Sequence, residues 1–292
     1  MAADATRRKL FKGAASFFPL IAQIVPRTLQ HRYSFVSDEW FRDAWNTGKL
    51  SVAERNYIIV LDVLEKSHLA AVSTLIRIER WADAVCIMHD TANFPGFASA
   101  MRGLIENGGD SIDGLLNIAR TLAENRRALS QALAREMKAD CINCAEIERP
   151  LDHYVHARWT GKKERHPVLT AKANVDYVRQ IGASLPGAVS LYHRLCAIVH
   201  PSNASIDWLF DLDAEGDRRM KLAANDAGKI AALCDEFPEV ADVTLQRTCN
   251  SALLILRVLH KFRLHPKIPE LRKLDWSQVR LGREIERLLD RD

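Results

Sequence analysis

The stretch YHRLCAIVHPSN, residues 192–203, places an arginine and a histidine near the end of an amphipathic helical pattern. Pro201 lacks an amide proton and disfavours helical geometry in the preceding residue, so we expect the helix to end near Val199. His200 then lies at a helix C-terminus, where the carbonyl dipoles stabilise imidazolium and bias its pKa upward. Such a position suits a proton-transfer group, and it also suits an ordinary capping residue.

A second polar pattern lies earlier in the chain, in SAMRGLIENGGDSIDGLL. Arg102, Glu106, Asp110 and Asp113 follow one another at spacings of four, four and three, so they share one helix face. If the face is solvated, each ion pair contributes only a few tenths of a kcal/mol. If it is buried, each charge needs several hydrogen bonds, as is typical of a site. The sequence leaves both interpretations open.

The same helix carries an apolar stripe and several glycines. The stripe is predicted to face the core and consists of Ala98, Met101, Leu104, Ile105 and Ile112. Glycine lowers helix propensity by about 1 kcal/mol, so three glycines in one helix indicate that another backbone comes close: Gly103, Gly108 and Gly109.

A basic loop, ARWTGKKERHP, is the third candidate. It combines one aromatic residue with four cations that could hold a phosphate backbone, namely Trp159 with Arg158, Lys162, Lys163 and Arg165. A solvated surface loop has the same composition. Nucleic-acid binding at this loop is therefore one of two interpretations.

Two groups of cysteine and histidine residues have spacings that resemble zinc ligands. They are His193, Cys196 and His200 in the motif, and Cys141 and Cys144 followed by His153 and His156. The first lacks a fourth ligand and the second lacks the glycines of a zinc knuckle. We expect packed cysteines and surface histidines, hence no metal and no cofactor, with less than one zinc per purified chain.

Together, VSLYHRLCAIVHPSN, the basic loop and the Arg102 helix resemble the HEPN superfamily (higher eukaryotes and prokaryotes nucleotide-binding), over about residues 52–215. More narrowly, they resemble a bacterial branch with the signature Y-x-x-L-S-x-x-x-H-P-S. The resemblance implies a helical bundle that dimerises. In active members an Arg-x(4–6)-His motif at the dimer interface makes the protein a metal-independent RNase, and that motif maps onto Arg194 and His200.

The chemistry of these two residues fits the implied activity. Attack by a 2′-hydroxyl on RNA needs a proton-transfer group near pH 7 and a cation for the charge that develops on the phosphate. Ser202 and Asn203 could add hydrogen bonds. Leu195 and Cys196 depart from the family pattern, which usually has a polar residue and a serine at these positions. Two functions follow: an endoribonuclease of toxin or defence type, or a non-catalytic interaction or nucleotide-sensing module with an Arg102/Glu106/Arg194/His200 polar network.

Composition narrows the class of protein. The 292 residues are 48% hydrophobic and 27% charged, which is typical of a globular chain, and the net charge of +4 is too small to indicate a partner. No apolar run reaches about 18 residues, so we expect no membrane association. The cysteines lie in apolar helical patterns, which favours a reducing, cytoplasmic location. Arg7-Arg8 also resembles a twin-arginine export signal, although the residues around it, Leu10 to Val25, read as one amphipathic helix.

Helical periodicity dominates the chain, and only SIDWLF, residues 205–210, reads as extended. We therefore predict an all-α, HEPN-like bundle of long antiparallel helices. Ser51 and Glu54 form a capping box that begins a helix running to His89. Further helices are expected at 97–124, onward to 148 with a break at Pro150, around LDHYVHARW at 151–159, from Thr170 to Gly182, from Pro186 to Val199, and near 226–236, 240–262 and 276–290. The predicted segments are a helical extension at 1–50, the bundle at 51–217 and a C-terminal helical segment at 218–292.

The resemblance implies RNA, a second copy of the chain and an antitoxin or defence protein as partners.

Overall fold

The computed structural model describes residues 2–158, 167–183, 185–212, 220–222 and 225–290. The chain forms two compact units, each built from segments that are distant in sequence. Unit 1 comprises Met1–Pro19, Ile76–Ile112 and Ala173–Cys249, and unit 2 comprises Leu20–Leu75, Asp113–Lys172 and Asn250–Asp292. Each unit thus takes residues from all three of the segments predicted above.

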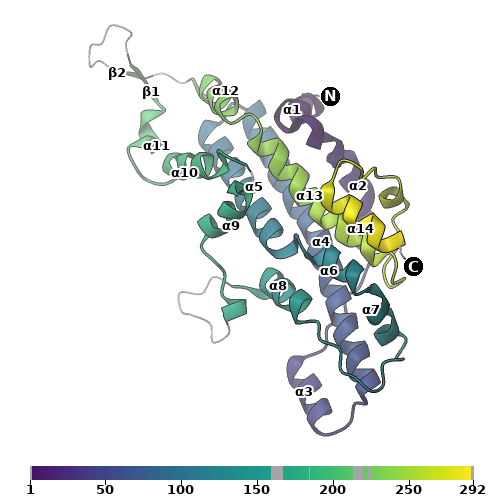
Figure 1. The fold of residues 1–292 in the computed structure, drawn as a ribbon. Helices are drawn as coiled ribbons and strands as arrows, with labels where there is room; N and C mark the ends of the chain where they lie inside the picture. The colour runs from purple at the N-terminus through teal and green to yellow at the C-terminus, as the bar shows by residue number, and fades with distance from the viewer. Residues whose placement is uncertain (1, 159–166, 184, 213–219, 223–224, 291–292) are drawn as a thin grey trace. The chain divides into compact units, whose positions relative to one another are not determined.

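The described residues are mainly α-helical, which confirms the all-α prediction (Figure 1). The first seven helices are α1 (Ala2–Phe11), α2 (Phe17–Thr28), α3 (Asp38–Asn46), α4 (Val52–Asp90), α5 (Phe94–Leu115), α6 (Ile118–Glu124) and α7 (Arg126–Leu133). The next seven are α8 (Ala145–His156), α9 (Asn174–Gly182), α10 (Ala188–Val199), α11 (Ala204–Asp207), α12 (Asp226–Glu236), α13 (Val240–Leu259) and α14 (Arg280–Asp290). Short 3-10 helices occupy Lys12–Ser16, Pro167–Leu169 and Pro269–Arg272.

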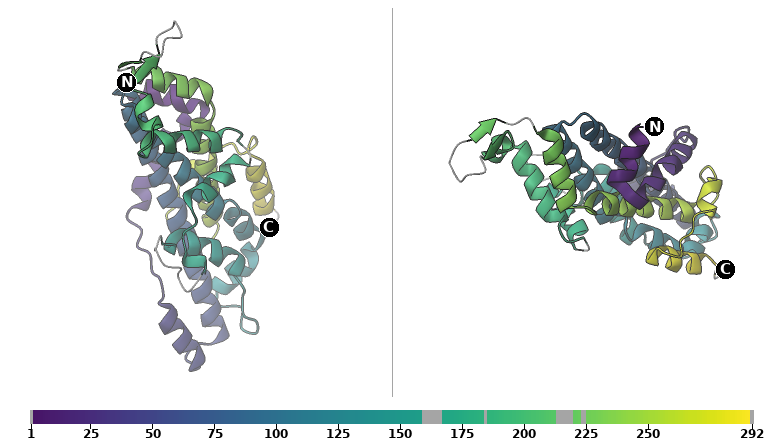
Figure 2. Two further views of the ribbon diagram at one scale, coloured as in Figure 1. Left: turned by 90° about the vertical axis from the view of Figure 1, so that its left-hand side faces the viewer. Right: turned by 90° about the horizontal axis from the view of Figure 1, so that it is seen from above.

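A short β-hairpin follows α11 (Figures 1 and 2). Its strands are β1 (Phe210–Leu212) and β2 (Met220–Leu222), which pair antiparallel with Phe210 opposite Leu222. The expectation that residues 205–210 are extended is wrong for most of that stretch. Ser205 to Asp207 belong to α11, where backbone amides bond back to Ser202 and Asn203.

The capping box at the start of α4 is present as predicted. The Ser51 amide donates to the Glu54 carboxylate at 2.9 Å, and the Glu54 amide donates to the Ser51 hydroxyl at 3.3 Å. These bonds satisfy amides that have no partner within the helix. α4 runs to Asp90, one residue beyond the predicted end.

Two helix predictions are wrong for identifiable reasons. Residues 134–144 lie outside the helices, because the buried Asn56 side chain bonds to this backbone instead. Its amide donates to the Met137 and Asp140 carbonyls at 3.2 and 2.8 Å, and its oxygen accepts from the Ile142 amide at 2.9 Å. The predicted break at Pro150 is also wrong, since α8 begins at Ala145 and continues through this proline into the short helix expected after it.

The N-terminal amphipathic pattern forms two helices rather than one. Lys12 has a φ of 41°, and a 3-10 turn separates α1 from α2. Of the residues that make up this pattern, Leu10, Ala14, Phe18 and Ile21 are buried, whereas Phe17 and Val25 are only partly buried. Among the described helices, none combines the length and the apolar character needed to cross a membrane.

Each unit has its own apolar core, in which one fully buried aliphatic or aromatic side chain contributes about 1.5–3 kcal/mol. In unit 1 the core includes Phe11, Ile78, Phe97, Leu104, Ile105, Ile181, Leu195 and Leu245. In unit 2 it includes Ile21, Val60, Leu64, Leu75, Leu115, Leu122, Leu151, Leu253 and Ile285. Helices α9 and α10 pack together in unit 1, and α14 packs on α6 in unit 2 (Figure 1).

Helix α5 buries the stripe predicted for it, with Ala98, Met101, Leu104, Ile105 and Ile112 all in the core. The close backbone approach predicted from its glycines is found at Gly109. A Cβ atom there would lie 2.5 Å from the carbonyl oxygen of Tyr177 in α9. The other two glycines make room for side chains, of Trp81 at Gly103 and of Thr244 at Gly108. This packing fixes the helix that carries Arg102 and Glu106.

Candidate functional site

Helix α10 ends at Val199, as the proline predicts, and His200 follows in an extended conformation with φ −84° and ψ 150°. The His200 amide donates to the Cys196 carbonyl at 2.9 Å, which holds the residue against the helix end. Its side chain is exposed. The imidazole is therefore presented at the surface of unit 1.

The polar residues of α5 meet one face of α10. Tyr192 and His200 are two turns apart on that face, while Arg102 and Glu106 are one turn apart on α5. The Tyr192 hydroxyl donates to Glu106 Oε1 at 3.0 Å, and Arg102 Nε donates to the same oxygen at 2.8 Å. Arg102 Nη1 lies 3.0 Å from His200 Nε2. We call these four residues the Arg–Glu–His cluster.

Glu106 keeps Arg102 charged and holds its guanidinium in position. Partial burial acts to lower the pKa of Arg102, but the hydrogen bond and charge of Glu106 outweigh it and raise that pKa. Burial, the Cys196 thiol and the Glu106 charge all raise the pKa of Tyr192, so its hydroxyl stays protonated and donates. The guanidinium is thus a permanent cation, held in place by a carboxylate.

The contact between Arg102 and His200 defines a tautomer. A guanidinium has only donors, so His200 Nε2 accepts, and the neutral ring then carries its proton on Nδ1. Once the cation turns to an anion, this nitrogen at an exposed helix end can take a proton from a hydroxyl. The Arg102 and Glu106 side chains remain 20% and 24% exposed, so a ligand in solvent can reach them.

Arg194 lies away from this contact. It forms an ion pair with Glu236 of α12, and both side chains are about half exposed. The two side chains therefore meet different neighbours, Arg194 a carboxylate of α12 and His200 the guanidinium of Arg102 on α5. Exposed pairs of this kind contribute about 0–1 kcal/mol, which leaves Arg194 free to exchange partners.

The other predicted polar residues bond elsewhere. Asp110 pairs with Arg77 at 3.0 Å in unit 1, and Asp113 pairs with Lys172 at 2.5 Å in unit 2. The Ser202 hydroxyl donates to the Ala197 carbonyl at 2.8 Å. The Asn203 carbonyl accepts from the Ile206 and Asp207 amides of α11.

The basic loop falls mostly outside the described residues, which exclude Trp159, Lys162, Lys163 and Arg165. Arg158 is described and belongs to unit 2. Its amide donates to the Leu169 carbonyl at 3.0 Å, and its carbonyl accepts from the Ala171 amide. Its side chain is exposed and remains a candidate for phosphate contact.

Neither zinc candidate from the sequence forms a cluster. Cys141 is exposed and Cys144 is buried, while His153 Nδ1 bonds to the Val168 carbonyl at 2.7 Å. Within the described part of the chain, one group of three or more potential ligands does converge, and it consists of His31, His68 and His265.

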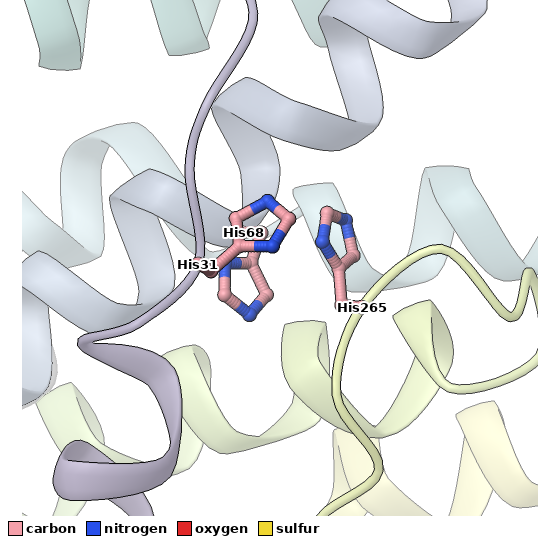
Figure 3. Close-up of side chains that lie close together, drawn as sticks. All are labelled: His31, His68 and His265. Carbon is pink, nitrogen blue, oxygen red and sulfur yellow. The ribbon is translucent and has the colours of Figure 1, made fainter.

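This histidine cluster was not predicted from the sequence. One nitrogen from each ring lies within 4.8 Å of the others (Figure 3). His31 precedes α3, His68 lies in α4, and His265 follows α13, so the three come from separate segments of unit 2. The one local signal was Glu65-x-x-His68, which puts a carboxylate and an imidazole on one helix face.

Burial sets the protonation of the cluster. It lowers the pKa of His68 to about 3 and that of His265 to about 4, with further lowering by the neighbouring histidines and a small opposing effect of the Leu64 backbone at His265. Burial, with the nearby Glu65 charge, raises the pKa of Tyr33 to about 12. At neutral pH the two buried rings are therefore uncharged and the phenol is protonated.

Comparison with known proteins gives no relative from which a function could be transferred. No family model matches the chain, and no curated protein or solved structure has significant similarity to it.

Proposed function

We propose that the protein is a metal-independent endoribonuclease, in which His200 and Arg102 act on the phosphate at the cleaved bond. The resemblance to HEPN proteins, noted for the motif that contains His200, supports RNA as the substrate. It also supports a homodimer that works in a toxin or defence setting with a partner protein. The local geometry supports a particular pair of residues.

The observation that carries the proposal is the 3.0 Å contact between Arg102 Nη1 and His200 Nε2 at an exposed helix end. Two groups that RNA cleavage needs, a proton acceptor and a fixed cation, are thereby adjacent. Glu106 and Tyr192 hold the cation through a short chain of hydrogen bonds. A residue that serves only as a helix cap does not need this support.

The reaction follows from these positions. Arg102 turns from His200 to a non-bridging phosphate oxygen, which frees the Nε2 lone pair. His200 then takes the proton of the 2′-hydroxyl as its oxygen attacks phosphorus. The 5′-oxygen leaves and takes a proton from solvent, so the products are a 2′,3′-cyclic phosphate and a 5′-hydroxyl. The guanidinium stabilises the charge on the phosphorane, where its forked donors match two oxygens.

Arg194 has a different part in this proposal from the one its spacing predicts. Its partner Glu236 is exposed, so a neighbouring RNA phosphate can replace that carboxylate at little cost. Arg194 then binds the strand without touching the reacting atoms. Its removal should weaken RNA binding, whereas removal of Arg102 should slow the chemical step.

The test compares variants on end-labelled RNA in buffer that contains EDTA. We expect His200→Ala to slow cleavage by about 100-fold or more, because it removes the proton acceptor. Arg102→Ala should slow it by a similar factor, and Arg102→Lys should restore little. Arg194→Ala should raise KM and change kcat by less than about threefold.

His193→Ala is the matched control, since His193 is an exposed histidine of the same helix that does not belong to the Arg–Glu–His cluster. Its cleavage rate should equal that of the wild type. Full activity of His200→Ala, or a larger loss of kcat for Arg194→Ala than for Arg102→Ala, would contradict the assignment.

A second candidate function has one observation in its favour. Arg102, Glu106, Tyr192 and His200 already satisfy one another, as the members of a structural polar network do. The protein would then be a non-catalytic interaction or nucleotide-sensing module. In that case wild type cleaves no RNA, and Glu106→Ala lowers the free energy of unfolding by about 1–3 kcal/mol through the donors that it leaves unpaired.

A further inference from the structure

The histidine cluster of unit 2 is unusual because several of its buried ring nitrogens lack hydrogen bonds. His68 and His265 are 1% and 7% exposed, and the His31 side chain is 14% exposed. His68 Nε2 and both nitrogens of His265 are buried without a hydrogen-bond partner among the described residues. A buried polar group without a partner costs about 1–3 kcal/mol, so this cluster is costly as it stands.

The ring nitrogens that do have hydrogen-bond partners are the ones that would not bind the metal. His31 Nε2 lies 2.8 Å from Glu65 Oε2, and His68 Nδ1 lies 2.8 Å from the Tyr33 hydroxyl. An ionised carboxylate only accepts, so His31 Nε2 carries a proton, and the neutral form of this ring has its lone pair on Nδ1. Histidines that bind metals commonly bond through the other nitrogen to a carboxylate or hydroxyl, which fixes the tautomer and the ring.

We propose that His31, His68 and His265 bind one divalent cation of the zinc type, with Glu65 and Tyr33 orienting the first two rings. The ligand atoms would be Nδ1 of His31, Nε2 of His68 and one nitrogen of His265. Imidazole ligands suit zinc, cobalt, nickel and copper, whereas magnesium and calcium prefer oxygen ligands. Three histidines leave the fourth position of a tetrahedral zinc for water.

Binding requires a small rearrangement of the rings. Zinc–nitrogen bonds of about 2.0–2.1 Å place ligand nitrogens roughly 3.4 Å apart, compared with the present limit of 4.8 Å. The His68 and His265 rings are stacked, with centroids 4.1 Å apart and planes 18° from parallel. One ring must turn about its Cβ–Cγ bond so that the lone pairs converge, and this torsion is soft in histidine.

The site would join three segments that are far apart in sequence. His31 lies in the connection between α2 and α3, His68 in the middle of α4, and His265 in the segment between α13 and α14. A cation bound to all three is bound by folded unit 2 and not by the unfolded chain. Binding therefore stabilises the fold, and the gain increases with the cation concentration.

The test uses the full chain, dialysed against EDTA and then against chelator-free buffer, and titrated with zinc chloride by calorimetry. We expect one zinc per chain, which replaces the sequence-based expectation of less than one, together with a submicromolar Kd and a rise in Tm. His265→Gln should weaken binding by at least about 100-fold, and Glu65→Gln by about 10–100-fold through the loss of ring orientation. His156→Gln removes an exposed histidine of the same unit and should leave the Kd unchanged.

Cobalt substitution gives a second readout that does not depend on stability. One equivalent of cobalt chloride should produce the visible absorption of a tetrahedral nitrogen-ligated ion in wild type and in His156→Gln, and not in His265→Gln. If His265→Gln loses helicity, the comparison of wild type with Glu65→Gln decides, since that variant keeps the size and an acceptor oxygen. Wild type without a submicromolar zinc site, or a Glu65→Gln variant that binds zinc as tightly as wild type, would overturn the proposal.

Discussion

Replacement of Gly109 by alanine gives the sharpest test of how α5 is positioned. In an exposed helix this change stabilises by about 1 kcal/mol, because alanine has the higher helix propensity. Here the added Cβ would lie 2.5 Å from the Tyr177 carbonyl oxygen, 2.6 Å from its carbon and 3.0 Å from the Val178 nitrogen. These atoms belong to the backbone of α9 and cannot move alone.

The magnitude follows from the shift that the contact requires. An ordinary Cβ contact is at least about 3.4 Å, so α5 and α9 must separate by nearly 1 Å at this point, and neighbouring contacts lose a quarter to a half of their attraction. Overpacking of this kind costs about 1–3 kcal/mol. A clash with backbone lies toward the upper end of that range, so after the gain in helix propensity we expect a net loss of about 1–2 kcal/mol, which lowers Tm by roughly 2–8 °C for a chain of this size.

Thermal unfolding followed by far-ultraviolet circular dichroism measures this change. Gly13→Ala is the matched control, since a Cβ at Gly13 has no atom within 4 Å, and its Tm should equal or slightly exceed that of the wild type. A Gly109→Ala variant with the Tm of the control would refute the close approach of α9 to α5. The same result would mean that packing of α9 against α5 does not hold Arg102 and Glu106 in position.

Two further predictions concern other parts of the fold. In a urea titration, Asn56→Ala should lower the free energy of unfolding by about 2 kcal/mol, because three backbone groups of residues 137–142 lose their partner. The control Asn46→Ala, at an exposed helix end, should leave that free energy unchanged. All six cysteines are free thiols, and native iodoacetamide labelling read by mass spectrometry should modify the exposed Cys141 first. Cys249 should react last, since it is fully buried and burial raises the pKa of its thiol, so that early labelling of Cys249 would contradict its place in the core.

Local signals in the sequence were sufficient where neighbouring residues decide the structure. The capping box at Ser51 begins α4, Pro201 ends α10 at Val199, and the bounds of α12 agree with the predicted 226–236. The signals failed where a distant side chain competes for the backbone. Residues 137–142 have a helical pattern, but Asn56 binds their amide and carbonyl groups from another helix.

In the candidate sites, too, local signals identify residues, whereas contacts between distant segments could not be predicted. Arg102, Glu106 and His200 were candidates in the sequence and Tyr192 was not, and the arginine that touches His200 is Arg102 and not Arg194. Spacing along a helix determines which of its faces a residue occupies. Which residues of another helix that face contacts is determined by tertiary packing. The histidine cluster could not be predicted at all, because its three members lie on segments with no local relation.

Cleavage of an RNA that differs only at the 2′-position tests the central proposal most directly. Wild type is incubated in EDTA with a 5′-labelled oligoribonucleotide and with the same sequence fully 2′-O-methylated, and the products are separated by electrophoresis. Because His200 must take a proton from the 2′-hydroxyl, we expect cleavage of the unmodified RNA to a 2′,3′-cyclic phosphate, and no cleavage of the methylated strand. Cleavage of both strands, or of neither, would contradict the assignment of His200 and Arg102 to RNA cleavage.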